Sequence, residues 1–379
     1  MNFQLTKEQE FVRKMVSDFA TTEVEPLAAD IDAEHRFPEE TVEKMAKYGL
    51  LGVPFPTEYG GAGGDHISYA ITVEELSKKC ASTGVICSAH TSLCCWPIFN
   101  WGTEEQRQKY LPDLLSGKKL GAFGLTEPNA GTDASGQQTR AEDCGDYWLL
   151  NGAKVFITNG GYADVFVVMA MTDKSKGNHG ISSFIVEKGD EGFSIGKTED
   201  KMGICASSTT ELIFQNCKIP KDRLLGEIGD GFKVAMSTLD GGRIGIASQA
   251  LGIAEGAYNK TVEYMKQRKQ FGRKLTQFEG LQFYIADMAT RIHAAQNLVY
   301  EAACKVDNGE PYGEAAAMAK LYAAETAMYV TTKAVQLHGG YGYTADYPVE
   351  RMMRDAKITE IYEGTSEVQK MVIAANELR

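Results

Sequence analysis

The sequence predicts an α+β fold with an N-terminal α-helical domain, a middle β-sheet domain and a C-terminal four-helix bundle. Three observations support this order. Apolar residues recur at helical spacing from Leu5 to about Gly117, short strands between polar turns follow, and long alanine-rich helices begin at Gly231. We therefore expect domains at residues 1–120, 121–230 and 231–379.

Helix-start patterns mark the first domain. Phe11, Met15 and Phe19 recur every four residues, which predicts an amphipathic helix with this stripe facing a core. The stretch Thr103-Glu104-Glu105-Gln106 has the spacing of a capping box, and its helix should end near Ser116-Gly117. The glycine-rich residues 59–65 neither follow a strand nor precede Lys-Ser/Thr, so they predict a connector between helices.

The middle domain contains a strong turn signal. Asn151-Gly152 lies between two apolar segments, residues 147–150 and 154–158, and supplies the positive φ angles of a type I′ turn, which predicts a β-hairpin. Further strands are expected at residues 165–171, 181–187 and 211–214. Short strands at this spacing predict a small sandwich or barrel that ends around Pro220.

The C-terminal part predicts long helices joined by short loops. These helices are expected at residues 231–267, 277–308, 312–337 and 365–378. Helices of this length with short connections are typical of an up-and-down bundle.

The composition is that of a globular protein, with 43% hydrophobic and 24% charged residues in 379. A net charge of −12 without a Lys/Arg-rich block argues against nucleic-acid and membrane-surface partners. The N-terminus has no secretory-signal pattern, and no apolar run reaches the roughly eighteen residues that a membrane span needs. Eight cysteines without paired spacing predict reduced thiols, so we expect a cytoplasmic protein.

Several kinds of site are excluded by pattern. The sequence contains no HExxH, no close His/Cys cluster and no repeated carboxylate spacing, so it predicts no metal site. A strand–GxGxxG–helix unit and a Gly-x-Ser-x-Gly elbow are also missing. Polar loop segments at the domain junctions remain, and such junctions are where ligand clefts usually lie.

One junction segment is Ile361-Tyr362-Glu363-Gly364-Thr365-Ser366-Glu367-Val368-Gln369. It predicts a tight loop followed by a helix that starts at Thr365, whose free N–H groups favour anionic or carbonyl ligands. Glu363 would then reach into a cleft. The same residues also describe an ordinary helix start with acids in its first turn.

Four segments together carry a family resemblance. They are Phe123-Gly124-Leu125-Thr126-Glu127-Pro128-Asn129-Ala130-Gly131-Thr132-Asp133, Gln267-Arg268-Lys269-Gln270-Phe271-Gly272, Gln336-Leu337-His338-Gly339-Gly340 and Tyr362-Glu363-Gly364-Thr365-Ser366-Glu367. In this order they resemble the acyl-CoA dehydrogenase signature that opens the β-domain, the Arg-x-x-Phe-Gly segment, the Gln-x-x-Gly-Gly turn and the C-terminal base loop. The resemblance covers essentially the whole chain. It implies a homotetramer, a dimer of dimers, with FAD between the β-domain and the C-terminal helices.

The resemblance also implies which residues bind FAD. Glu279 departs from the glutamine that many members carry near this position, and because phosphate would repel an acid, it should contact a ribose hydroxyl or amide, or not bind FAD. The expected FAD-binding residues are Phe123, Leu125, Thr126, Gly131, Thr132, Phe156, Ile157, Thr158, Arg268, Phe271, Glu279, Gln336, Leu337, Gly339, Gly340, Thr365, Ser366 and Glu367.

Taken alone, these residues also have structural interpretations. Phe156 and Thr158 point to one strand face, which suits a flavin or a core position. Arg268 offers a five-donor fork for a pyrophosphate, including that of a neighbouring subunit, or is an exposed helix-end arginine. The pair Gly339-Gly340 allows the backbone to approach the FAD diphosphate or adenosine, or caps a helix.

The reaction is implied by the same resemblance. Glu363 would remove the pro-R α-proton of an acyl-CoA thioester while the β-hydrogen leaves as hydride for flavin N5, giving trans-2-enoyl-CoA. Some members carry the base at the position of Gly242, which leaves Glu363 as the base here. Burial should raise the pKa of Glu363 toward neutrality. Substrate contacts are expected from Thr132, Asp240, Arg243, Tyr362 and Gly364, although Asp240 and Arg243 could instead form a local ion pair.

The resemblance also implies that residues 88–97 line the acyl pocket, and it is strongest to the short-chain members of the family. Bulky Leu93 and Trp96 favour a C4, butyryl-CoA-like chain, and a branched short chain stays open because one methylene is worth only about 1–3 kcal/mol. Electron-transferring flavoprotein is the expected partner. The reverse crotonyl-CoA reduction, an acyl-CoA oxidase and a non-catalytic family scaffold are the alternatives.

Overall fold

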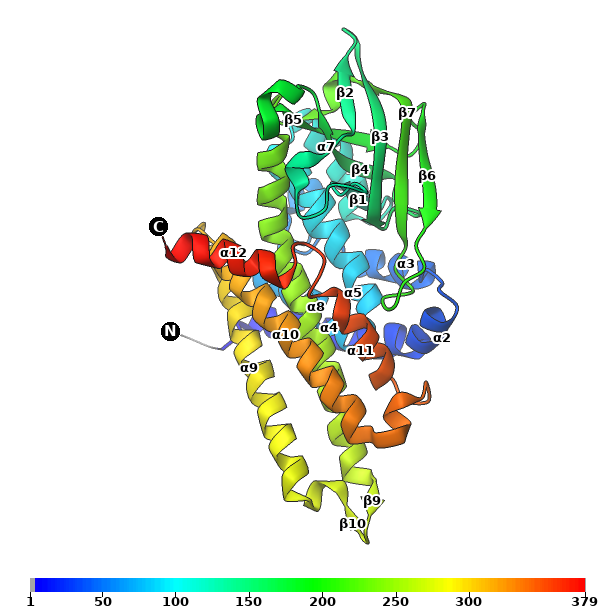
Figure 1. Cartoon of the computed structure of the whole chain (residues 1–379), viewed down its shortest axis with the longest axis vertical. Coiled ribbons are helices and arrows are strands. Elements are labelled where there is room, and N and C mark those ends of the chain that lie inside the picture. Colours follow the sequence, from blue (N-terminus) through cyan, green and yellow to red (C-terminus); the bar gives the residue numbers. More distant parts are fainter. Residues whose placement is uncertain (1–3, 379) are drawn as a thin grey trace.

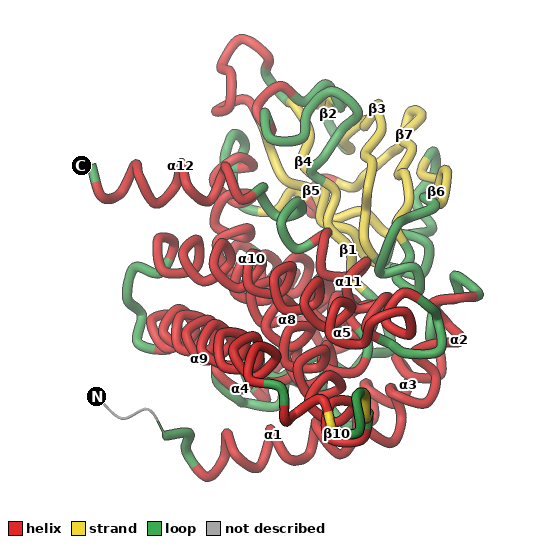
Figure 2. The backbone as a smooth tube through the Cα atoms, turned by 60° about the horizontal axis from the view of Figure 1, so that its bottom comes forward, coloured by secondary structure: helices red, strands yellow, loops and turns green. Residues whose placement is uncertain are grey.

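The computed structural model describes residues 4–378 and contains helices, then a sheet, then helices along the chain (Figure 1). The strands β1 to β8 gather at one end of the molecule and the long helices extend toward the other, where the short strands β9 and β10 lie (Figures 1 and 2). The predicted α+β class is therefore confirmed. None of the helices in residues 4–378 is long and apolar enough to cross a membrane.

The N-terminal helices begin at residues that cap them. Thr6 and Thr103 each accept a hydrogen bond from a backbone N–H one turn later and form capping boxes with Gln9 and Gln106. The predicted capping box at Thr103 is confirmed. A π-helical stretch at Ala89–Cys95 joins two of these helices. The helices are α1 (Lys7–Phe19), α2 (Ala28–Ala33), α3 (Glu39–Lys47), α4 (His66–Lys79), α5 (Ala81–Ser88), α6 (Trp96–Trp101) and α7 (Glu104–Leu115).

The stripe predicted on α1 is wrong at Phe11. Its side chain is 68% exposed, whereas Val16 and Phe19 are buried. Four residues advance the helix by about 40° more than one turn, so a strict four-residue spacing drifts off the buried face within two steps.

The middle region forms one eight-stranded sheet in the order β6-β7-β3-β2-β4-β5-β8, with β1 paired parallel to β4. Along β4, Phe166 and Val168 face the core inside the sheet, while Val165 and Val167 face helices. This alternation lets the sheet bury both faces of one strand. The strands are β1 (Gly121–Gly124), β2 (Arg140–Asp143), β3 (Tyr147–Thr158), β4 (Val165–Met171), β5 (Ile181–Glu187), β6 (Phe193–Thr198), β7 (Thr209–Pro220) and β8 (Leu224–Leu225).

The hairpin turn predicted at Asn151-Gly152 is wrong. Both residues lie inside the continuous strand β3, at a β-bulge opposite β7. The chain reverses earlier, where Gly145 has φ 84° and Cys144 N–H donates to Tyr147 O. Glycine is needed at 152 for a different reason, because a Cβ there would lie 2.5 Å from Thr139 Oγ1.

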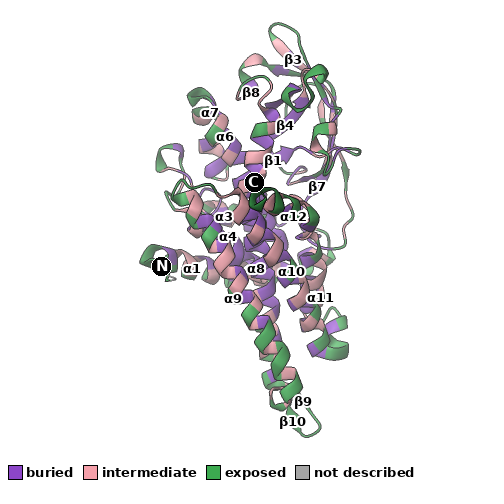
Figure 3. Ribbon diagram, turned by 60° about the vertical axis from the view of Figure 1, so that its left-hand side comes forward, coloured by how far each residue is buried: buried purple, intermediate pink, exposed green. Residues whose placement is uncertain are grey.

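Long helices form the C-terminal region, and alanines let them approach closely. Ala250, Ala254, Ala316 and Ala323 are all fully buried in one core. Figure 3 shows buried residues along α8 and α10 and an exposed end at the β9–β10 hairpin. The elements are α8 (Gly231–Gln267), β9 (Lys269–Gln270), β10 (Arg273–Lys274), α9 (Glu279–Asp307), α10 (Gly313–His338), α11 (Val349–Ile358) and α12 (Ser366–Glu377).

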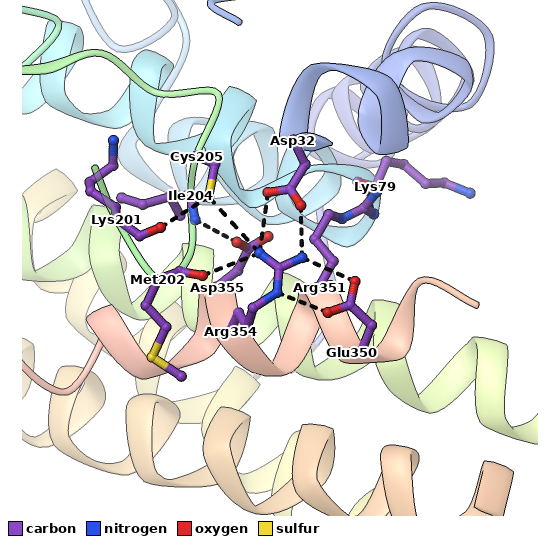
Figure 4. Close-up of polar contacts among 10 residues, drawn as sticks. All are labelled: Asp32, Lys79, Lys201, Met202, Ile204, Cys205, Glu350, Arg351, Arg354 and Asp355. Atoms are coloured by element: carbon purple, nitrogen blue, oxygen red, sulfur yellow. Dashed lines mark hydrogen bonds and ion pairs between the residues drawn. The ribbon is translucent and has the colours of Figure 1, made fainter. Parts of the chain in front are cut away.

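Helix α11, which the sequence did not predict, joins all three regions (Figure 4). Arg354 binds Asp32 of α2 through Nη2 at 2.7 Å and donates from Nη1 to Met202 O at 3.2 Å in the β6–β7 loop. The next residue, Asp355, accepts from Ile204 N–H at 2.5 Å. Because Asp355 lies only eight positions before Glu363, these bonds fix where the loop after α11 begins.

We expect Gly152→Ala to lower the free energy of unfolding by about 1–3 kcal/mol, because the new Cβ meets Thr139 and the φ of 146° disfavours a side chain. Urea unfolding measures this change. Gly189→Ala is the matched control, since no atom lies within 4 Å of a Cβ there, and it should change stability by less than about 0.5 kcal/mol. Equal stabilities of the two variants would contradict the bulge argument.

Candidate active site

The loop between α11 and α12 has an unusual backbone. Glu363 has φ 54° and Gly364 has φ 96°, so two consecutive residues lie in the left-handed region. Glycine adopts this region freely, whereas a glutamate does so at a cost of about 1–2 kcal/mol. Thr365 then caps α12 by accepting from Val368 N–H at 3.3 Å, as predicted. Such strain persists only where surrounding contacts hold it.

Side chains from three helices hold this loop. Lys320 Nζ of α10 donates to Gly364 O at 2.7 Å, and Gln369 Nε2 of α12 donates to the same oxygen at 2.9 Å. Tyr362 OH donates to Gln249 Oε1 of α8, and Gln249 Nε2 donates to Ala81 O at 2.9 Å. The loop is therefore fixed on both sides of Glu363.

The Glu363 carboxyl lies against Gly242 of α8. A Cβ added at Gly242 would stand 2.1 Å from Glu363 Oε2 and 2.9 Å from Leu93 Cδ2, so any side chain there would displace the carboxyl from this position. Glu363 Oε2 is shielded from solvent and has no hydrogen-bond partner among residues 4–378. An unpaired buried carboxylate oxygen is free to accept a proton from a bound molecule.

Burial raises the pKa of Glu363 to about 7, and the nearby cations Lys320 and then Arg243 limit the rise. A general base works best when its pKa is near the working pH. The residue predicted as the base thus has both the free oxygen and the pKa that a base needs.

The predicted substrate-side residues Asp240 and Arg243 do form the local ion pair that was left open, with Nη1 and Oδ1 2.6 Å apart. Arg243 Nε and Ser366 Oγ are also buried and without partners in the described part of the chain. Buried polar groups are normally satisfied, so these two groups are available to hydrogen-bond a polar ligand.

A small apolar cavity of about 20 Å³ lies beside Gly241, the neighbour of Gly242 on α8. It is lined by Tyr69, Ser92, Trp96, Gly241 and Ile244, among others. Leu93 contacts the space beside Gly242, and Trp96 approaches Gly241, where a Cβ would lie 3.7 Å from Trp96 Nε1. Leu93 therefore lies at the same glycine as the candidate base, and Trp96 lies at the glycine before it.

A second surface comes from the sheet. Phe156 of β3 has φ 61° and is 64% exposed, and Thr158 is half-buried, while Ile157 between them is buried in the sheet core. The loop after β1 is fixed to β3, because Val155 N–H donates to Thr126 O at 2.8 Å and Lys154 Nζ donates to Leu125 O at 3.0 Å. An exposed phenylalanine beside an anchored backbone segment suits a planar ring ligand.

Other expected cofactor residues around this surface differ in exposure. Phe123 and Leu125 are 9% and 8% exposed and belong to a core, so their backbones are the parts left for a ligand. Gly131 and Thr132 are exposed, and no atom lies within 4 Å of a Cβ built at Gly131. Glu367 is exposed at the start of α12, where helix N–H groups lower its pKa.

A second group of expected residues lies far from the first. Helix α8 has 37 residues, about 55 Å of axis, and carries Arg268 to the end opposite the sheet (Figures 1 and 3). The Arg268 guanidinium lies 5.4 Å from the Tyr341 ring centre, and Phe271 is 92% exposed with φ 53°. Glu279, Gln336, Gly339 and Gly340 are exposed at this same end, whereas the Leu337 side chain is buried.

The two groups of expected residues cannot meet one cofactor within a single chain, because the length of α8 separates them. A single chain therefore brings together only the expected residues on the sheet and in the loop after α11. No group of three His, Cys, Asp or Glu residues suited to a metal occurs within residues 4–378.

Sequence reasoning missed Lys320, Gln249, Gln369 and Lys154. A signal existed for Lys320, since it is a lone charge on a stripe with Ala316, Ala319 and Ala323. Helical spacing places these four residues on one buried face. The other three have no distinguishing pattern along the chain.

Comparisons with known proteins bear on this site. Models of the N-terminal, middle and C-terminal domains of acyl-CoA dehydrogenases match residues 6–118, 122–217 and 229–378. The chain is 64% identical to a short-chain specific acyl-CoA dehydrogenase of Clostridium acetobutylicum, over 100% of both chains. It superposes with TM-score 0.99 on butyryl-CoA dehydrogenase from Megasphaera elsdenii, at 54% identity over 100% of both chains. A chain in a structural study of the electron transferring flavoprotein of Acidaminococcus fermentans gives TM-score 0.99 and 56% identity, also over 100% of both.

We predict that Glu363→Gln is more stable than the wild type above neutral pH. The folded pKa of about 7 exceeds the ordinary 4.5, so the wild type loses stability relative to the variant as pH rises from about 4.5 through 7. Urea unfolding at about pH 5 and about pH 8 should give equal stabilities at the lower pH and a variant favoured by roughly 1–3 kcal/mol at the higher. A pH-independent difference would contradict the raised pKa.

Proposed function

The chain belongs to the acyl-CoA dehydrogenase family, and on that premise we propose that it interconverts a short-chain, butyryl-CoA-like acyl-CoA and its trans-2-enoyl-CoA. The observation that carries the proposal is the Glu363 carboxyl, buried against Gly242 with a free Oε2 and a pKa raised by burial to about 7. This is the arrangement that removal of a weakly acidic α-proton requires.

The family depends on FAD, and the residues present fit this cofactor. Exposed Phe156, half-buried Thr158 and the anchored backbone after β1 would hold the flavin, and the buried Ser366 Oγ, which has no partner in the described chain, is a further proposed contact. When bound, FAD supplies the acceptor for the hydride that leaves the substrate β-carbon. Thr365 and Glu367 at the start of α12 are further proposed contacts.

The proton chemistry belongs to the loop after α11. Glu363 takes the α-proton, and a positioned base contributes roughly 10²–10⁴-fold. The thioester oxygen gains negative charge as the proton leaves, so we assign the Glu363 backbone N–H as one donor to it, a contribution of about 10²–10³-fold. The proposed substrate contacts are Arg243, Asp240, Tyr362, Gly364 and Thr132.

A short acyl chain is favoured by the side chains around the base. The bulky Leu93 lies against Gly242 and Trp96 lies against Gly241, so a long acyl chain beside the base would have to displace them. The C. acetobutylicum relative named short-chain specific and the M. elsdenii relative named for butyryl-CoA support the same size. A branched C5 chain is the second candidate, since one methyl group changes binding by only about 1–3 kcal/mol.

Two partners follow from the geometry and from the relatives. The second group of expected FAD residues lies a helix length away from the sheet. We propose that this group completes the FAD site of a second copy in a homotetramer; it consists of Arg268, Phe271, Gln336, Gly339 and Gly340. The relative studied with electron transferring flavoprotein supports that protein as the electron partner. The eight free cysteines favour a cytoplasmic location.

Glu363→Gln should bind FAD and acyl-CoA but leave the flavin colour unbleached by butyryl-CoA, because an amide cannot take the α-proton. Anaerobic absorbance titration measures this. Glu360→Gln is the matched control, since its carboxylate already pairs with Lys357 at 2.6 Å, and it should bleach like the wild type. Full bleaching of Glu363→Gln would remove Glu363 from the role of base.

Anaerobic titration of the wild type with C4, C6, C8 and isovaleryl thioesters tests the substrate. We expect the fastest and most complete bleaching with C4. Preference for isovaleryl thioester would favour the branched alternative, and rapid oxygen consumption by the reduced protein would favour an oxidase. Absence of bleaching with every thioester would favour a non-catalytic scaffold.

A further inference from the structure

Lys320 is a buried lysine whose amine is bonded to the loop that carries Glu363. Its side chain is 0% exposed, and Nζ donates to Gly364 O at 2.7 Å. The stripe around it, with Ala316, Ala319 and Ala323, is alanine, and burial lowers the pKa of Lys320 to about 8. A buried amine costs free energy, so its presence on an alanine stripe needs compensation from its surroundings.

The compensation lies in the strained loop. Glu363 and Gly364 both have positive φ, a conformation that a glutamate adopts only when held. The Gly364 carbonyl accepts from Lys320 and from Gln369 Nε2, and Gln369 also reaches Glu363 O at 3.3 Å. Two donors, one from α10 and one from α12, therefore fix the peptide between Gly364 and Thr365, and Gln369 also holds the peptide that directly follows the base.

The charges around the base single out Lys320. Arg243 is engaged with Asp240 at 2.6 Å, whereas the Lys320 ammonium donates its hydrogen bond to the loop itself. The groups that interact electrostatically with Glu363 are Lys320 of α10, Arg243 of α8, Tyr69 of α4 and the adjacent Tyr362. The groups that act in the same way on Lys320 are Glu363, Arg243, Glu360 and Glu367.

We propose that Lys320 is a positioning residue for the base: by holding Gly364 O it keeps the Glu363–Gly364 pair left-handed and aims the Glu363 carboxyl at the substrate α-carbon. The inference rests on the proposed function, in which Glu363 takes that proton. Lys320 need not touch substrate for this role, because it acts through the peptide next to the base.

Two substitutions separate the hydrogen bond from the charge. Lys320→Met removes both at similar length, and Lys320→Gln keeps a shorter neutral donor. Misplacing a catalytic group by about 1 Å can cost roughly 10²-fold, so we expect kcat to fall about 10–100-fold in Lys320→Met with KM changed less than about threefold. Lys320→Gln should recover part of kcat.

The dependence of the rate on pH reports the loss of the Lys320 charge. Without the ammonium the Glu363 carboxylate is less stabilised, so its pKa rises above about 7 and the rising limb of the rate against pH moves upward, by about one pH unit, in both variants. Amide hydrogen exchange of residues 359–369 reports the loop directly and needs no substrate. Exchange should be faster in Lys320→Met than in the wild type.

Lys370→Met is the matched control. It also removes an ammonium that joins α12 to α10, through Glu325 at 3.4 Å, but its side chain is 58% exposed. It should leave kcat, the pH limb and exchange of the loop unchanged. If Lys320→Met does not fold, the shift of the rising limb of rate against pH in Lys320→Gln tests the proposal instead.

The positioning role would be overturned if the Lys320 variants fold, bind FAD and match the wild type in three properties. These are kcat, the position of the rising limb of rate against pH, and the amide hydrogen exchange of residues 359–369. A wild type that no thioester bleaches would instead overturn the proposed function. In that case the exchange measurement alone still decides whether Lys320 holds the loop.

Discussion

Burial of an unpaired carboxyl against a glycine is the constraint on which the rest of this molecule depends. Glu363 Oε2 has no partner in the described chain, and Gly242 leaves room for it that any Cβ would take. Such a group destabilises the fold when ionised. The surrounding structure offsets the cost with two cations and with hydrogen bonds that hold a left-handed glutamate. Strain and a raised pKa at one residue are typical of a site where stability is given up for chemistry.

The three regions of the chain meet just before this residue. Arg354 and Asp355 on α11 bind the N-terminal helix α2 and the β6–β7 loop of the sheet domain (Figure 4). A short loop then leads to Glu363. The junction therefore fixes the base relative to the sheet, so that the exposed Phe156 surface and the carboxyl keep one geometry. Precise placement matters because catalytic groups lose efficiency steeply with displacement.

The long helices impose a second arrangement. Helix α8 passes beside the base at Gly242 and ends at Arg268, so one element carries both the candidate active site and a distant basic, aromatic end. The exposed Phe271 and the glycines after α10 lie at that end, far from the sheet of the same chain. The proposed cofactor site is thus divided between copies, which would couple assembly to cofactor binding.

The sequence by itself determined the α, β, α order, the bounds of α8, the cap at Thr365 and the glutamate beside a glycine, because these depend on periodicity and on local hydrogen bonding. Only the tertiary structure decided that Asn151-Gly152 is a bulge inside a strand, since the reason for Gly152 is its contact with Thr139 on another segment. It also revealed the partner of Lys320. A lysine on an alanine stripe stands out along the helix, but the helix does not say what it binds. Its partner, the Gly364 carbonyl, lies 44 residues away and is brought to it by packing alone.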